Sequence, residues 1–334
     1  MVNGIGTANP SVTITPALNQ AGVAVISVSV NDNDVNEPRS ATANIALMVR
    51  PNTNVVAIDY FNYDTSGSLD VVSGGFWRHL SGPFGQMVVG SGVATVDMSA
   101  NTENLQIPLL GGPYKTNSGA ILYSSFIVNM DPTLDPLKMP RLNGTYFALF
   151  NDGSGVTGPY ECRVVVATNG MPPGYYQLGI NNFGADWTSA QMFPQNLSPN
   201  SNYVVVTALV LSNGFSTLWV NPSSQSSPSV TDINPAPSAT NLYNIAAFEL
   251  RESGANGGQV NVSHLKVGTT FDSVFPSLQV QPAGANVIVN WSDPSLGIQS
   301  TTNLLSPFSD VTGATPPYTN NAGTNSVMFF RFKP

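Results

Sequence analysis

The sequence predicts an all-β, multi-domain protein, and three observations lead to this fold class. Apolar and polar residues alternate, or β-branched residues gather in short runs such as 23–30 and 203–206. These patterns are typical of strands, and a 3.6-residue apolar period is nearly absent. The 30 glycines and 26 prolines separate the runs at the spacing of turns. Many short strands joined by frequent turns favour a sandwich or a barrel.

The first expected unit is a partial β domain over residues 1–51. Three strands are predicted in it, at 11–15, 23–30 and 41–49. A complete immunoglobulin-like sandwich needs about seven strands. Residues 1–51 are therefore expected to lack part of a domain.

Two further units are expected after it. Residues 52–275 are predicted to form a long series of strands without a linker-like break. A single β-sandwich domain can have this length. Residues 276–334 form a short third unit that closes on the aromatic segment 329–332. The 334 residues are thus divided into 1–51, 52–275 and 276–334.

The composition excludes several classes of function. Charged residues make up 9 % of the chain, against about 25 % in an average soluble domain. The net charge is −8 and no Lys/Arg cluster exists, so nucleic acid is not an expected partner. No apolar run approaches the roughly 20 residues that cross a bilayer, so no transmembrane segment is expected.

An extracellular or cell-surface location is expected from this low-charge surface rich in Asn, Ser, Thr and Gly. The N-terminus shows no basic region followed by an apolar core, so no signal peptide is predicted, and a mature product or a fragment is expected. Cys162 is the single cysteine, which rules out a disulfide within the chain. Its strand-like surroundings predict a buried apolar role.

Residues 13–22, with the sequence TITPALNQAG, and the alternating segment 26–32 resemble the second half of bacterial immunoglobulin-like or cadherin-like repeats. The first half of the repeat is missing. The tail is similar to a short C-terminal β module of surface proteins, for which the resemblance implies export or attachment. Its motifs are 298–304, 311–314, 317–319 and 329–332.

The middle unit resembles the laminin-G-like, concanavalin-A-like jelly rolls of large surface and secreted bacterial proteins. The motifs that carry this resemblance are 59–63, 73–77, 177–180, 218–222 and 265–271. It implies a jelly-roll sandwich at the cell surface. The family commonly has an acidic residue before the Leu of its last strand, where this chain has Ser263 followed by His264. A structural cation at that position is therefore in doubt.

No enzymatic signature is found. Glucanases of this fold carry their carboxylates as an E-x-D-x-E strand, which is absent, and Glu103, Glu161, Glu249 and Glu252 are isolated in sequence. His79 and His264 are the only histidines, and neither lies near a G-x-S-x-G elbow. The chain is therefore expected not to be an enzyme, although a sandwich can bring distant carboxylates together.

Calcium is the one metal that the sequence favours. Residues 30–37 carry oxygen-bearing side chains of the kind that calcium prefers. Asn and Asp also dominate ordinary turns, which is the alternative interpretation. The candidate ligands are Asp32, Asp34, Asn36, Glu37 and, more weakly, Asp59.

Sugar binding would use exposed aromatic faces with polar neighbours. The candidates are Trp77, Arg78, His79, Trp187, Tyr175 and Tyr176. Trp219 and Trp291 alternate with aliphatic residues inside strands and are expected in the core.

Three functions stay open. The leading hypothesis is a non-catalytic module for adhesion or carbohydrate recognition, whose partner is a glycan or a cell-surface polymer. The second is a subunit of an extracellular filament or layer, which assembles with copies of itself through shared strands at residues 1–51. The third is a carbohydrate-active hydrolase or lyase.

Overall fold

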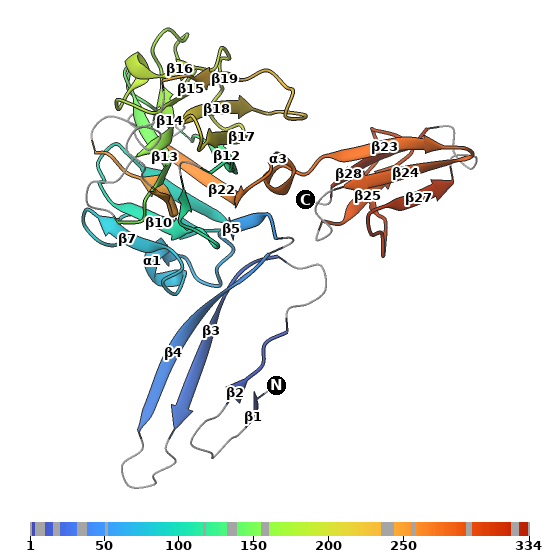
Figure 1. The fold of residues 1–334 in the computed structure, drawn as a ribbon, viewed down its shortest axis with the longest axis horizontal. Coiled ribbons are helices and arrows are strands. Elements are labelled where there is room, and N and C mark those ends of the chain that lie inside the picture. Colours follow the sequence, from blue (N-terminus) through green and yellow to red (C-terminus); the bar gives the residue numbers. More distant parts are fainter. Residues whose placement is uncertain are drawn as a thin grey trace. The chain divides into compact units, whose positions relative to one another are not determined.

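The computed structural model of the chain falls into two compact units, Gly22–Ser277 on the one hand and Met1–Ala21 with Leu278–Pro334 on the other (Figure 1). The residues that it describes are 2–3, 11–15, 21–31, 39–50, 53–115, 118–131, 139–154, 160–234, 244–254, 258–291, 296–321 and 327–332.

A two-sheet β-sandwich makes up most of the larger unit, which confirms the predicted all-β class. Its first sheet has seven antiparallel strands within the described residues. In spatial order these are β16 (Gln191–Met192), β15 (Gln177–Asn181), β14 (Glu161–Ala167), β13 (Thr145–Asn151), β21 (Ala247–Arg251), β10 (Asn104–Pro108) and β7 (Arg78–Ser81).

The second sheet has nine strands in the same part of the chain, with β5 (Val55–Asp59) paired beside β22. The others, in spatial order, are β19 (Val230–Asp232), β18 (Phe215–Val220), β17 (Tyr203–Val210), β12 (Ile121–Asn129), β22 (Gln259–Gly268), β9 (Val93–Asp97), β8 (Val88–Gly90) and β6 (Gly67–Ser68). Short elements join the strands: α1 (Leu69–Val72), η2 (Trp187–Ser189), α3 (Phe271–Val274) and the pair β11 (Tyr114–Lys115) and β20 (Asn244–Ile245).

The core lies between the two sheets, because every second side chain of each strand points inward. Phe126 of β12 packs against Phe147 of β13 and Phe248 of β21, with ring centroids 6.1 and 6.0 Å apart. All three are buried, and each fully buried Phe contributes about 1.5–3 kcal/mol. Cys162 is buried in the same core, as expected.

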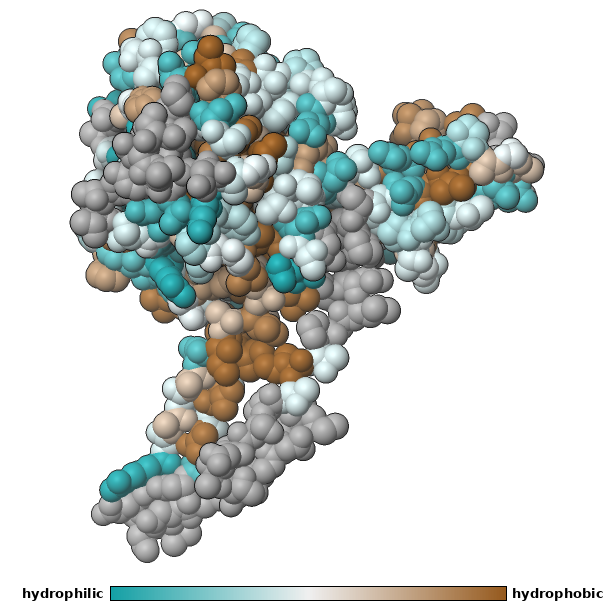
Figure 2. All heavy atoms as spheres, in the orientation of Figure 1, coloured by the Kyte–Doolittle hydropathy of each residue, from teal (hydrophilic) through white to brown (hydrophobic). Residues whose placement is uncertain are grey.

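The N-terminal strands β3 (Gly22–Asn31) and β4 (Ser40–Val49) form a long hairpin in full register. They confirm the strands expected at 23–30 and 41–49. Figure 2 shows apolar side chains gathered on part of this hairpin, and its partly buried positions lie toward the Gly22 and Val49 ends. Ahead of it, β1 (Val2–Asn3) pairs with β2 (Ser11–Val12), so strand structure covers only the start of the segment expected at 11–15.

The C-terminal residues form two small three-stranded sheets around Val289, Trp291 and Ile298. Their strands are β23 (Leu278–Ala283), β24 (Asn286–Trp291), β25 (Ile298–Thr301), β26 (Ser309–Asp310), β27 (Tyr318–Asn321) and β28 (Phe329–Phe332). Trp291 and, in the larger unit, Trp219 are buried as expected. No helix in the described part of the chain is long and apolar enough to span a bilayer.

Candidate functional site

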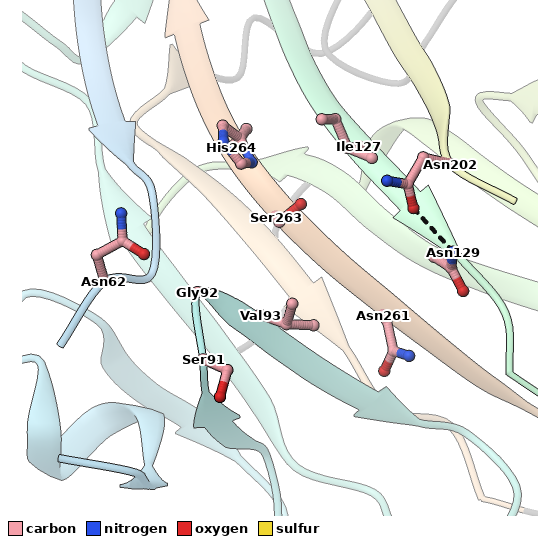
Figure 3. Close-up of a pocket in the computed structure, with 10 residues that line it drawn as sticks. All are labelled: Asn62, Ser91, Gly92, Val93, Ile127, Asn129, Asn202, Asn261, Ser263 and His264. Carbon is pink, nitrogen blue, oxygen red and sulfur yellow. Dashed lines mark hydrogen bonds between the residues drawn. The ribbon is translucent and has the colours of Figure 1, made fainter. Parts of the chain in front are cut away.

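A polar pocket of about 450 Å³ lies against the outward face of the nine-stranded sheet (Figure 3). Its size falls within the range of about 300–1,000 Å³ that is usual for small-molecule sites. Strands β9, β12 and β22 supply its floor, and three connecting segments supply its rim. The lining residues are Asn62, Ser91, Gly92, Val93, Ile127, Asn129, Asn202, Asn261, Ser263 and His264.

A β-bulge in β22 places two consecutive side chains in the pocket. In a regular strand one of the pair Ser263 and His264 would point into the core. The pairing with β12 instead shifts, from Lys266 opposite Ser125 to Ser263 opposite Ile127. The extra residue in β22 is accommodated by His264 at φ +55°. Both side chains therefore face the pocket, while the flanking Val262 and Leu265 are buried in the core.

The turn between β8 and β9 forms one side of the pocket. Ser91 and Gly92 both have positive φ, 53° and 78°, as a tight two-residue hairpin turn requires. A Cβ at Gly92 would lie 2.7 Å from Oδ1 of Asn62. Glycine at position 92 thus leaves room for the Asn62 amide.

Asp59 holds the segment that carries Asn62. Its carboxylate is buried and accepts hydrogen bonds from the Phe61 amide (2.7 Å), the Tyr63 hydroxyl (2.5 Å) and the Trp77 indole (2.7 Å). Phe61 adopts φ +58° and stacks on Trp77, with centroids 5.9 Å apart. Burial raises the pKa of Asp59, and the three donors oppose that shift. The result is a fixed backbone on both sides of Asn62.

Side-chain amides dominate the chemistry of the pocket. Asn129 Nδ2 donates to Asn202 Oδ1 at 2.8 Å, drawn as the dashed line in Figure 3. Thr95 Oγ1 donates to Asn261 Oδ1 at 3.3 Å. Because each amide offers two N–H donors and an acceptor oxygen, several donors and acceptors are left for a ligand.

No carboxylate, Lys or Arg lines the pocket, as far as the described residues show. His264 is the titratable group of the pocket. Burial lowers the pKa of His264, and the nearby charge of Lys266 lowers it further. Its imidazole is therefore neutral at pH 7. Tyr60 packs beside it, with ring centroids 5.6 Å apart. The pocket can exchange hydrogen bonds with an uncharged ligand, and it contains no pair of carboxyl groups for acid–base chemistry.

Two of the predicted sugar-binding aromatics are wrong because they are buried. Trp77 is completely buried and donates its indole N–H to Asp59. Tyr176 is also completely buried, and its ring packs edge-on to Tyr203. Neither ring has a face available to a sugar.

The remaining candidates lie at the surface but outside the pocket. Arg78 is exposed, and His79 stacks on exposed Phe84 with centroids 3.6 Å apart. Trp187 is partly buried and donates Nε1–H to Asn143 Oδ1 at 2.8 Å. Tyr175 is 38 % exposed. Their role in ligand binding stays a prediction.

The calcium prediction has two outcomes. Asp32, Asp34, Asn36 and Glu37 lie outside the described residues. Asp59 is corrected to a structural residue, because N–H and O–H donors occupy both carboxylate oxygens. In the portion of the chain that is described, no group of three or more His, Cys, Asp or Glu residues is placed to hold a metal ion.

A scan against family models finds no match, and neither does a search of the curated proteins. Similar solved structures include lectin II from Ulex europaeus, at 15 % identity and TM-score 0.35, covering 62 % of this chain and 99 % of that one. The metal-free Emp46p carbohydrate recognition domain has 6 % identity and TM-score 0.38, covering 64 % and 95 %. Alginate lyase PA1167 from Pseudomonas aeruginosa has 12 % identity and TM-score 0.34, covering 51 % and 75 %. At such values the ligands and activities of these proteins do not transfer to this chain.

Proposed function

We propose that this protein is a non-catalytic carbohydrate-recognition module that acts in adhesion outside the cell, and that the pocket on β9, β12 and β22 binds a neutral glycan. One observation carries the proposal: Asn62, Asn129, Asn202 and Asn261 converge on one pocket that no charged side chain lines among the described residues.

Asparagine amides suit a saccharide because each sugar hydroxyl both donates and accepts a hydrogen bond, as an amide does. The apolar C–H faces of the sugar also need a surface, which Val93 and Ile127 offer in the pocket. A mixture of apolar lining and a few placed polar groups is the usual composition of small-molecule sites. The neutral His264 adds one further donor or acceptor.

The placement of the glutamates supports a non-catalytic role. Glu103, Glu161, Glu249 and Glu252 are all buried. Glu103 accepts hydrogen bonds from three successive backbone amides, those of Gly85, Gln86 and Met87, which is a structural use of a carboxylate. None of the four lines the pocket.

The binding proposal is tested by calorimetry with the best neutral oligosaccharide from a glycan array. Asn261→Ala and Asn129→Ala are each expected to weaken binding about tenfold, because one or two net hydrogen bonds are worth about 1–1.5 kcal/mol. Asn290→Ala, at an exposed position in the C-terminal sheets, serves as the matched control and should bind like the wild type. Unchanged affinity in both pocket variants, with a ligand that does bind, would contradict the proposal.

Assembly into a filament or layer is the second candidate, and the hairpin β3–β4 favours it. Within the described residues this sheet has two strands only, so each strand has an edge that could pair with another chain. Size-exclusion chromatography with light scattering distinguishes the two functions. Ordered oligomers in the wild type that are lost in Val28→Pro, which removes a backbone donor within β3, would favour assembly. A monomer at all concentrations would exclude it.

A further inference from the structure

Arginines are concentrated on the outward face of the seven-stranded sheet, although the chain has only 11 Lys and Arg residues and a net charge of −8. Arg78, Gln106, Glu249 and Leu149 form one row across four strands, since Gln106 pairs with both Arg78 and Glu249, and Glu249 pairs with Leu149. Arg163 of β14 and Arg251 of β21 lie on the two strands that flank β13. The three arginines, together with Gln106, Tyr146 and Asn181, are called the arginine stripe below.

The ring of Tyr146 contacts two guanidinium groups. The Cζ atom of Arg251 is 4.1 Å from the ring centroid, and that of Arg163 is 4.9 Å away. Both arginines are partly buried, and burial lowers the pKa of Arg163. Stacking on one aromatic ring orients two cations toward the same region of the sheet.

Neither guanidinium forms an ion pair with a carboxylate in the described structure. Arg163 donates to the backbone carbonyls of Tyr160 (2.7 Å) and Gly184. Among the described residues, Arg251 makes two long contacts, 3.4 Å to Thr145 Oγ1 and 3.3 Å to the Tyr146 carbonyl. Since a guanidinium has five N–H donors in a planar fork, both groups keep donors for an anion.

Two buried acceptors on the stripe have no hydrogen-bond partner within the described part of the chain. They are Gln106 Oε1 and Asn181 Oδ1, on residues that are 8 % and 0 % exposed. Gln106 Nε2 donates to the Gly153 carbonyl at 3.1 Å, and Asn181 Nδ2 donates to Ser189 Oγ at 3.0 Å. These two bonds fix which end of each amide is the nitrogen and which is the oxygen. An unpaired buried acceptor is uncommon in native structures, and a ligand hydroxyl would satisfy it.

The carboxylates near the stripe do not cancel its charge. Glu249 is almost fully buried and accepts from Asn151 Nδ2 at 2.7 Å. Burial raises the pKa of Glu249 to about 7, against the opposing effects of Asn151, Arg251 and Arg163. Near neutral pH, Arg163 and Arg251 thus lie near a Glu249 that is only partly ionised, and Glu161 lies near Arg163.

We propose that the arginine stripe is a second binding site, which takes the carboxylate groups of an acidic saccharide. Arg163 and Arg251 donate to the carboxylate, in the bidentate geometry that suits a guanidinium. Gln106 and Asn181 accept hydrogen bonds from the hydroxyls of the same sugar or its neighbours. The site lies on a different sheet from the asparagine pocket and does not depend on the function proposed for that pocket.

Calorimetry with a matched pair of ligands tests this proposal. The probes are trigalacturonate and galactotriose, which differ by a carboxylate in place of a hydroxymethyl group on each ring. The wild type is expected to bind trigalacturonate at least tenfold more tightly, with an affinity that falls as salt is added. Arg251→Gln and Arg163→Gln should each lose at least tenfold, whereas Arg331→Gln in the C-terminal sheets should lose nothing. Equal affinity for the two ligands, or no loss in the arginine variants, would overturn the proposal.

Gln106→Leu separates binding from a structural role. It removes the acceptor without a partner among the described residues, and also the bond that Gln106 Nε2 donates to the Gly153 carbonyl. The two effects on stability oppose each other, so the variant should unfold within a few degrees of the wild type. Binding of trigalacturonate should nevertheless weaken several-fold. Lower stability with unchanged affinity would mean that the residue is only structural. Asn261→Ala should leave trigalacturonate binding unchanged, which distinguishes a failure of this site from a failure of the asparagine pocket.

Discussion

Replacing Asp59 with alanine is expected to lower the free energy of unfolding of the sandwich by about 3 kcal/mol or more. The substitution leaves the Phe61 amide, the Tyr63 hydroxyl and the Trp77 indole without their acceptor, and each such buried donor costs about 1–3 kcal/mol. The loss of the burial penalty on the carboxylate offsets part of this cost. Urea denaturation followed by tryptophan fluorescence measures the change.

Asp64→Ala is the matched control, because Asp64 lies in the same segment and is exposed. It should change the free energy of unfolding by less than about 0.5 kcal/mol. Where Asp59→Ala remains folded, its affinity for the neutral glycan should also fall, since Asp59 fixes the backbone around Asn62. A free energy of unfolding within 1 kcal/mol of the wild type would show that the three bonds do not hold this segment.

Stability is expected to decrease as the pH rises from 5.5 to 8. Burial raises the pKa of Glu249 from its usual 4.5 to about 7, so the folded protein binds more protons than the unfolded chain between these values. By linkage, the free energy of unfolding falls as pH rises through this interval and levels off above it. Glu249 alone contributes a decrease of about 2 kcal/mol between pH 5.5 and 8. Glu252, whose pKa is also raised to about 7 by burial, acts in the same direction.

Thermal unfolding at pH 5.5 and 8.0 measures this dependence, with Glu249→Gln as the diagnostic variant. The groups facing Glu249 are Asn151, Arg251, Arg163 and Tyr160, and burial raises the pKa of Tyr160 further above this pH range. The variant should therefore show a clearly weaker pH dependence than the wild type. An identical dependence in the two proteins would assign the proton uptake to other groups.

The sequence predicts the strands well because alternation of polar and apolar residues directly reports which side of a sheet is buried. The hairpin β3–β4 and the buried Trp219 and Trp291 follow from this pattern. Local chemistry was a poorer guide. The run Trp77-Arg78-His79 resembles a sugar-binding edge, yet the Trp77 indole bonds to Asp59, 18 residues earlier in the chain.

The asparagine pocket could not be predicted, for two physical reasons. Asn129 and Asn202 are 73 residues apart, and only the pairing of β12 with β17 brings them together. The bulge that turns His264 outward depends on register between strands, which alternation within one strand does not encode. The alternation of polar Gln259, Asn261 and Ser263 with buried Val260 and Val262 was a local signal of the outward face of β22.

Glycan binding in the asparagine pocket is tested most sharply by a titration with a neutral oligosaccharide, followed through the side-chain NH₂ signals of the asparagines in ¹⁵N-labelled protein. The signals of Asn62, Asn129, Asn202 and Asn261 are expected to shift together with one dissociation constant, while that of Asn290 stays in place. Binding that leaves these four signals unchanged, or a failure of every neutral saccharide in the array to bind, would contradict it.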